Sequence, residues 1–131
     1  MLDLTLDQKD KLTRMQFRAQ QYQYRSLYPH ADFDLVLIDS EAIGNLYVQR
    51  GPHEFVLIDI SLLPGHRNSG IGAGLVRKII VDAKKAGRPL QAHVLKHNPA
   101  WRLWQRLGFH LVSDDGIYLR IEVSAGNSRY D

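Results

Sequence analysis

The spacing of apolar residues predicts a long helix at the start of the chain. Small and apolar residues recur there at steps of three and four, the spacing that places side chains on one face of a helix. These residues are Leu12, Met15, Ala19, Tyr22 and Ser26. Thr5 and Asp7 are both suitable N-caps, and Pro29 cannot continue a helix. We therefore expect a helix from Thr5 or Asp7 to about Ser26.

Short apolar stretches separated by turn residues predict six strands in the rest of the chain. The predicted strands are Phe33–Ile38, Ile43–Arg50, Glu54–Leu63, Leu90–Leu95, Phe109–Val112 and Ile117–Val123. The third is the most apolar, which favours a central strand buried on both faces. Two helices, at about Ile71–Ala86 and Pro99–Leu107, are predicted between the later strands, and a glycine follows each of them.

The predicted order is α-β-β-β-α-β-α-β-β, which indicates the α/β (α+β) class. Three strands joined by hairpins precede a single crossover helix, so the sheet should be mixed, antiparallel at first and with one parallel pair across that helix. A length of 131 residues suits one domain spanning residues 1–131. We expect residues 124–131 to form a loose tail.

Composition excludes several classes of protein. The chain has no cysteine, which excludes disulfides, thiolate–zinc sites, iron–sulfur clusters and a cysteine nucleophile. No apolar run approaches the ~20 residues of a membrane span, and the first residues do not resemble a signal peptide. Six histidines without matched spacing do not indicate a metal site. A cytoplasmic enzyme or binding module is expected.

Charge is distributed unevenly along the chain. The segment Ile60–Arg106 carries nine basic residues and one acid, a net charge of +8, whereas the other residues carry a net −5. This asymmetry favours an anionic ligand for the second half, either a nucleotide-like cofactor or nucleic acid. The alternative is a basic helix face that is simply solvated.

A glycine-containing segment lies between the most apolar strand and the following helix. It reads Arg67-Asn68-Ser69-Gly70-Ile71-Gly72. Glycines allow the backbone to approach a ligand closely, and the first N–H groups of a helix can bind a pyrophosphate. An ordinary strand–helix turn would give the same pattern. The segment lacks the Gly-Lys-Ser/Thr of a Walker loop and the third glycine of a dinucleotide fingerprint.

A second segment, further along the chain, makes the pattern of the glycine segment specific for one family. Arg67-x-x-Gly70-x-Gly72 is similar to the acetyl-CoA motif Arg/Gln-x-x-Gly-x-Gly/Ala of the GCN5-related N-acetyltransferase superfamily. Asn98-Pro99-Ala100, followed by Leu103-Trp104-Gln105-Arg106-Leu107-Gly108-Phe109, resembles that family's second signature. The resemblance covers about Phe33–Val123. It implies a mostly antiparallel sheet with flanking helices, in which the parallel pair separates at the cofactor site. Because little sequence precedes the first helix, residues 1–6 could form a truncated first strand, or a second subunit could fill that edge in a homodimer.

The resemblance implies acetyl-CoA as the co-substrate. The pyrophosphate would lie on the loop, the pantetheine arm would pair with the preceding strand, and an N–H near Leu62 would hold the developing oxyanion. The cofactor-binding residues implied are Ile60, Ser61, Leu62, Arg67, Asn68, Ser69, Gly70, Ile71, Gly72, Ala73 and Asn98. Asn98 could equally cap the helix that begins near Pro99.

The implied activity is transfer of acetyl to a primary amine of a small molecule or peptide by direct attack, with no nucleic-acid or membrane partner. Tyr22, Tyr24 and Tyr28 lie where this family often shapes its acceptor pocket. The runner-up is a non-catalytic acyl-CoA-binding module of the same fold. A third hypothesis is a nucleic-acid-binding domain that stacks bases on Trp101 and Trp104.

The sequence predicts the catalytic acid and base less specifically than it predicts the cofactor loop. Trp104 occupies the position where relatives carry a tyrosine general acid, and an indole N–H cannot protonate a thiolate. His93, Asp59 and Glu54 are the candidates for the base. Strict strand alternation would place Asp59 and Glu54 on opposite faces of the sheet.

Overall fold

A computed structural model describes residues 26–126, and contacts divide the chain into two units at Ala31 and Asp32. In the first unit, Ser26 and Leu27 are helical, and the backbone N–H of Ala31 donates to the carbonyl of Tyr28 at 3.1 Å in the turn that follows. The predicted end of the first helix is thus confirmed. The rest of that helix, residues 1–6, Tyr22, Tyr24 and the tail from residue 127 lie outside the described residues.

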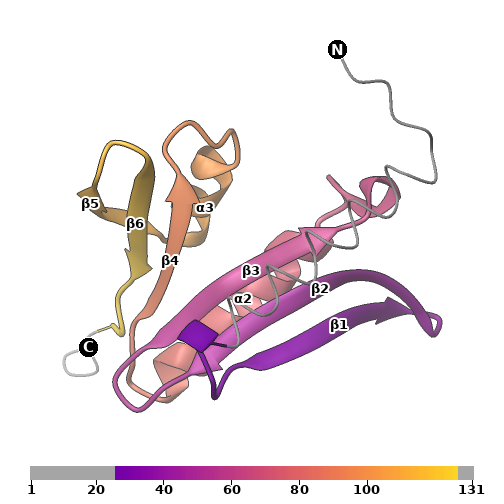
Figure 1. Cartoon of the computed structure of the whole chain (residues 1–131), viewed down its shortest axis with the longest axis horizontal. Helices are drawn as coiled ribbons and strands as arrows, with labels where there is room; N and C mark the ends of the chain where they lie inside the picture. The colour runs from indigo at the N-terminus through magenta and orange to yellow at the C-terminus, as the bar shows by residue number, and fades with distance from the viewer. Residues whose placement is uncertain (1–25, 127–131) are drawn as a thin grey trace. The chain divides into compact units, whose positions relative to one another are not determined.

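The second unit contains a six-stranded sheet with the strand order β1-β2-β3-β4-β6-β5 (Figure 1). Its strands are β1 (Asp32–Ile38), β2 (Glu41–Arg50), β3 (Phe55–Leu62), β4 (Leu90–Leu95), β5 (His110–Asp114) and β6 (Tyr118–Val123). Only β3 and β4 pair in parallel, and the other neighbours are antiparallel. The predicted fold class is therefore confirmed, with each strand found within two residues of its expected ends.

Two α-helices follow β3 and β4. Helix α2 (Ile71–Lys85) begins at Gly70, and helix α3 (Trp101–Leu107) begins two residues later than predicted. At the end of α2, the N–H of Arg88 donates to the carbonyl of Ala83 and the N–H of Gly87 to that of Lys84. This pair of bonds closes the helix because Gly87 adopts a φ of 70°.

The main core lies between one face of the sheet and α2. Helix α2 buries one stripe of side chains, at Val76, Ile79, Ile80 and Ala83. These pack with residues from the central strands, including Val48, Leu57, Leu90 and Ile121. We call this side of the sheet the α2 face, and the other side the opposite face.

Strands β3 and β4 are paired over a short length only. Phe55, Val56 and Leu57 pair with residues 90–92, and the two strands then diverge (Figure 1). These three side chains of β3 are buried, whereas residues 58–62 are half-buried or exposed. The expectation that this strand is buried on both faces along its length was therefore wrong, because its second half has no β4 neighbour to cover it.

A β-bulge in β3 changes which side chains share a face. Val48 of β2 pairs with Leu57, but Tyr47 pairs with Asp59, so one extra residue of β3 lies between these pairs. Leu57 before the bulge and Ile60 after it both pack on the α2 face, three residues apart instead of an even number. Asp59 therefore lies on the opposite face, with Tyr47.

The same bulge corrects the expectation about Glu54 and Asp59. Glu54 accepts a hydrogen bond from Gln91, which lies between the core residues Leu90 and Ala92 and hence on the opposite face. Glu54 and Asp59 thus share a face. Strict alternation predicted otherwise because the extra residue could not be seen in the sequence.

Candidate functional site

Where β3 and β4 diverge, backbone groups on that side of β3 have no strand partner within residues 26–126. We call this region, beyond Leu57 in β3 and beyond Ala92 in β4, the β3–β4 opening. The N–H of Leu63 donates to the carbonyl of Ile43 in β2 at 2.7 Å. Because neighbouring residues of an antiparallel strand direct their N–H and C=O groups to alternate sides, Ile60 and Leu62 direct theirs into the opening.

The glycine loop lies directly after this stretch of β3. Asn68 and Gly70 adopt left-handed conformations, with φ of 58° and 85°. Gly70 is the N-cap of α2, and no side chain among residues 26–126 caps that end of the helix. The first N–H groups of α2 therefore remain available to an anion, in the region where the helix dipole is positive.

Side chains of the loop fold it back onto β3. The Nε of Arg67 donates to the carbonyl of Leu62 at 2.9 Å, and the hydroxyl of Ser69 donates to the carbonyl of His66 at 2.8 Å. Arg67 thus uses one nitrogen to join the loop to the edge of the opening. Arg67 is exposed, and the terminal amino groups of a guanidinium can donate to phosphate oxygens.

Asn98 lies in the loop between β4 and α3. Its side-chain oxygen accepts a hydrogen bond from the N–H of Ala100 at 2.8 Å, which closes the turn before α3. The prediction that Asn98 is the N-cap of this helix was wrong, because α3 begins two residues later than expected, with Ala100 as its N-cap and no side-chain cap among residues 26–126. Asn98 also lines a hollow of about 500 Å³, together with neighbours in its own loop and with Gly116 and Ile117 of the β5–β6 turn. Its cofactor role stays a prediction.

Asp59 is a half-buried carboxylate beside the opening. Burial raises the pKa of Asp59 above its usual value, and a hydrogen bond from the backbone N–H of Ile60 opposes part of that increase. A carboxylate with a raised pKa accepts protons more readily at neutral pH than an ordinary aspartate does.

His93 lies on the other side of the opening, one residue beyond the last pairing of β4 with β3. It alternates with the core residues Ala92 and Val94, so its exposed side chain lies on the opposite face, as that of Asp59 does. Its cross-strand neighbour is Arg120 of β6. The structure therefore brings Asp59 and His93 to the same face of one opening.

Glu54 occupies a different place. It precedes the paired end of β3, where its carboxylate accepts a hydrogen bond from Gln91. Gln91 in turn accepts one from the Nε of Arg120 at 2.8 Å. Glu54 is thus engaged in a polar chain on the opposite face, away from the open end of the strand.

Trp104 packs against the core on α3. Its ring meets that of Phe109 edge to face, with centroids 5.8 Å apart. The indole Nε1 is buried, and no residue among 26–126 accepts its hydrogen. A buried donor without an acceptor is costly, which makes this position unusual in the core.

A row of polar side chains on β2 and β3 that was not predicted from the sequence lies beside the opening. The hydroxyl of Ser61 donates to the side-chain oxygen of Asn45, and the Nδ2 of Asn45 donates to the hydroxyl of Tyr47 at 3.3 Å. Asn45 is only 8% exposed. The alternation of polar Asn45 and Tyr47 with Leu46 and Val48 was the available signal, but it is equally typical of a strand with one solvated face.

Two negative findings apply to the part of the chain that the structure describes. Residues 26–126 contain no group of three or more His, Asp or Glu side chains placed to hold a metal ion. Within the same residues, no helix is both long and apolar enough to cross a membrane.

Solved structures with the same fold include several acetyltransferases. A GNAT family acetyltransferase from Elizabethkingia anophelis with acetyl-CoA bound has a TM-score of 0.65 at 17% identity, covering 78% of this chain and 82% of that one. The PaiA N-acetyltransferase from Thermoplasma acidophilum in complex with coenzyme A has a TM-score of 0.69 at 17% identity, covering 92% and 80%. The ribosomal-protein-S18-alanine N-acetyltransferase from Escherichia coli has a TM-score of 0.63 at 20% identity, covering 72% and 68%.

Identities at this level show the fold alone. No curated protein matches the sequence. The model of the acetyltransferase (GNAT) family, however, matches residues 2–109. That match includes the strand–loop–helix unit around Gly70 and the segment from Asn98 to Phe109. Since it spans most of the sequence, the chain belongs to the acetyltransferase (GNAT) family.

Proposed function

We propose that this protein is an N-acetyltransferase that moves acetyl from acetyl-CoA to a primary amine by direct attack. The observation that carries the proposal is the β3–β4 opening, which adjoins the N-terminus of α2 and into which the carbonyl of Ile60 and the N–H of Leu62 are directed. An anion site and an unpaired strand edge side by side suit a ligand with a pyrophosphate and an amide-containing arm.

In this proposal the loop residues hold the pyrophosphate. The backbone N–H groups of residues 70–73 would donate to its oxygens, with Arg67 adding positive charge. The pantetheine amides would pair with Ile60 and Leu62 in the way that a further strand would. Asp59 already engages the N–H of Ile60, which leaves the N–H of Leu62 as the donor we assign to the thioester oxygen.

The chemical step needs a base beside the amine substrate. Asp59 or His93, which lie on one face of the opening, would take a proton from the ammonium form of the substrate. The amine nitrogen then forms a bond to the thioester carbon, and the C–S bond breaks to release CoA thiolate. The nitrogen loses its second proton to water, or to the base once the base has released the first proton to solvent, so no covalent enzyme intermediate is required.

Departure of the thiolate must proceed without the usual acid. The indole of Trp104 can donate a hydrogen bond but cannot supply a proton at neutral pH. In this proposal CoA therefore leaves as the thiolate and is protonated by solvent.

The direct test is release of CoA thiol from acetyl-CoA in the presence of polyamines, amino acids, aminoglycosides and peptide N-termini. We expect one class of amine to accelerate release and to gain an acetyl group detectable by mass spectrometry. Hydrolysis that no amine accelerates would contradict transfer.

Trp104 favours a second candidate, a non-catalytic acyl-CoA-binding module. Trp104→Tyr restores a phenol at the acid position, and it separates the two proposals. A working enzyme should gain modestly in kcat, less than the ~10²–10⁴-fold that a positioned acid supplies, because the smaller ring also leaves a cavity. Acetyl-CoA binding by both forms, with turnover by neither for any amine, would favour the binding module. Circular dichroism of the variant controls for folding.

A further inference from the structure

Four side chains form a patch on the opposite face of the sheet, beside the β3–β4 opening. His93 and Leu95 of β4 pair directly with Arg120 and Tyr118 of β6. Each of the four alternates with core residues of its strand, so all of them lie on the same face. The Cβ atoms of directly opposed residues are about 4.5–5.5 Å apart, which places the four side chains within reach of one small ligand. We call these four residues the β4–β6 patch.

Arg120 is a half-buried cation that its neighbours hold in place. Its Nε donates to the side-chain oxygen of Gln91 at 2.8 Å, and Gln91 is only 8% exposed. Glu122, the next residue of β6 on this face, is not bonded to Arg120, which forms no salt bridge within residues 26–126. Its positive charge is therefore not neutralised by direct contact with a described carboxylate. The paired terminal N–H groups of a guanidinium match the two oxygens of a carboxylate.

The other end of the β4–β6 patch is apolar and exposed. Leu95 is 55% exposed and Tyr118 is 46% exposed. Leu95 and Ile117 also line the hollow of about 500 Å³ beside Asn98, a volume within the usual range of ~300–1,000 Å³ for small-molecule sites. Large apolar side chains that are exposed together suit the apolar part of a ligand.

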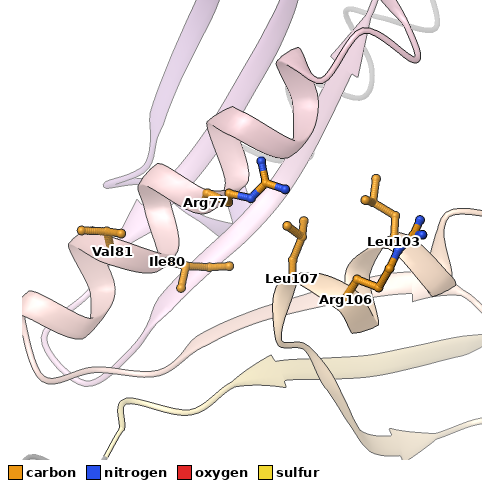
Figure 2. A pocket seen from close by; sticks show the side chains of 6 residues that line it. All are labelled: Arg77, Ile80, Val81, Leu103, Arg106 and Leu107. Carbon is orange, nitrogen blue, oxygen red and sulfur yellow. The ribbon is translucent and has the colours of Figure 1, made fainter.

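The two other arginines that lie beside a hollow are on the other side of the sheet. A groove of about 570 Å³ between α2 and α3 is flanked by Arg77 and Arg106 (Figure 2). Both helices pack on the α2 face, whereas the candidate bases His93 and Asp59 lie on the opposite face. Arg120 shares the face of both bases, so it is the arginine placed to meet an anionic group of the acceptor.

An α-amino acid with an apolar side chain carries the three groups that the β4–β6 patch suits. Its amino group and its carboxylate are attached to one carbon, so they need partners on adjacent side chains, such as His93 and Arg120. Its apolar side chain is attached to the same carbon and would lie against Leu95 and Tyr118. A polyamine or an aminoglycoside carries only positive charge, which Arg120 would repel.

We infer that the acceptor is a free α-amino acid with an apolar side chain, whose carboxylate binds Arg120 and whose side chain lies on Leu95 and Tyr118. The inference rests on the proposed function, because it requires acetyl transfer at the β3–β4 opening, and it narrows that function to one class of amine. The amine nitrogen forms a bond to the thioester carbon, the C–S bond breaks, and the products are the N-acetyl amino acid and CoA.

The test compares L-leucine, L-leucinamide and L-serine as acceptors for the full chain, by release of CoA thiol and by mass spectrometry of the product. Leucinamide keeps the amine and the apolar side chain but lacks the carboxylate, whereas serine keeps the carboxylate and lacks the apolar side chain. We expect kcat/KM for leucine to exceed that for each of the others by about tenfold or more, the effect of losing a charged hydrogen bond or a buried aliphatic side chain.

Variants of the patch test the two contacts separately. Arg120→Gln should raise KM for leucine about tenfold and leave kcat/KM for leucinamide nearly unchanged, and Arg120→Lys should restore part of the loss. Leu95→Ser should reduce the preference for leucine over serine. Lys84→Gln is the matched control, because it removes one positive charge from the last turn of α2. Circular dichroism checks the fold of each variant, and the comparison of acceptors on wild type needs no variant.

Each outcome bears on one or both proposals. Leucinamide or serine used as well as leucine would overturn the inference and leave the proposed function standing, and so would a polyamine used better than leucine. An equal rise of KM in Lys84→Gln and Arg120→Gln would show that only general charge acts, which also overturns the inference. No acceleration of CoA release by any amine would overturn both.

Discussion

Asp59 and His93 face the same opening from neighbouring strands, and the bulge in β3 is what brings Asp59 there. If β3 alternated regularly from Leu57 onward, the side chain of Asp59 would point toward the core under α2. Burial already raises its pKa on the opposite face. Burial of the charged carboxylate therefore destabilises the folded state, and groups with such shifted pKa values are common at functional sites.

Replacing Asp59 by asparagine should stabilise the fold at neutral pH. Because the pKa of Asp59 is raised by burial, the folded state binds its proton more tightly than the unfolded state does. Asp59 therefore contributes to the stability of the wild type below about pH 4, the ordinary aspartate pKa. This contribution is lost as the pH rises through the raised pKa of Asp59. Thermal unfolding of Asp59→Asn should give a Tm a few degrees above wild type at pH 7, and a smaller difference at pH 4.

The control for that comparison is Asp34→Asn, which removes the same charge from an exposed position on β1. An equal gain in Tm from the control would mean that net charge, and not the burial of Asp59, sets the difference. A Tm of Asp59→Asn below wild type at pH 7 would contradict the prediction outright.

His93→Ala should lower kcat and leave the affinity for acetyl-CoA nearly unchanged. The side chain lies at the opening on the opposite face of the sheet, away from the glycine loop's helix, and removal of a positioned base costs ~10²–10⁴-fold. His110→Ala, which alters an exposed histidine on β5, should keep full kcat. Full kcat in His93→Ala would transfer the role of base to Asp59.

At the scale of elements, Gly44 sets the separation of β2 and β3 at the opening. A Cβ at this position would come within 2.1 Å of the carbonyl oxygen of Ser61 and 3.0 Å of the Cα of Leu62, both backbone atoms that cannot rotate away. Gly44 thus allows β2 to lie close under the stretch of β3 that we assign to pantetheine.

Gly44→Ala should therefore lower stability by about 1–3 kcal/mol, the usual cost of overpacking, and should weaken acetyl-CoA binding by displacing Ile60 and Leu62. Gly65→Ala is its control, because a Cβ there would meet nothing within 4 Å. Urea unfolding measures the first effect and calorimetry the second. Equal stability of the two variants would show that β2 and β3 can separate at no cost.

The order and approximate ends of these elements could be predicted from the sequence, since apolar spacing and turn residues mark them locally. The bulge at Ile58 could not, because it depends on the register between β2 and β3 and no residue in the run Phe55–Leu62 signals it. The separation of β3 from β4 was predicted from the family resemblance, which the short pairing confirms, and not from the apolar spacing. An apolar run does not reveal where its neighbour departs.

Some residues of the candidate site could likewise be predicted from the sequence, and others could not. Gly70 and its neighbours could be predicted, because a glycine loop before a helix is continuous in sequence. Asn45, Tyr47 and Ser61 could not, since their hydrogen bonds join two strands, and polar residues on a strand face are common. The groove of Arg77 and Arg106 depends on how two helices pack, which spacing within either helix does not show.

For the molecule as a whole, the uneven charge now has a structural interpretation. The basic segment Ile60–Arg106 contains the end of β3, the loop, α2, β4 and most of α3, which surround the opening and the groove. Positive charge concentrated around one anionic ligand would both bind it and speed its association. Under the proposed function, this charge would serve the phosphates of coenzyme A.

The most direct test of acetyl-CoA binding at the loop is calorimetry of acetyl-CoA with wild type, Gly70→Val and Gly74→Ala. Gly70 has a φ of 85°, which a β-branched residue rarely adopts, and its added side chain would enter the space above the first N–H groups of α2. Gly74 lies one turn later with no atom within 4 Å of an added Cβ, so alanine should be tolerated there. We expect saturable binding to wild type and Gly74→Ala, and loss of most affinity in Gly70→Val with its fold retained by circular dichroism. Unchanged affinity in Gly70→Val would contradict the placement of acetyl-CoA on this loop.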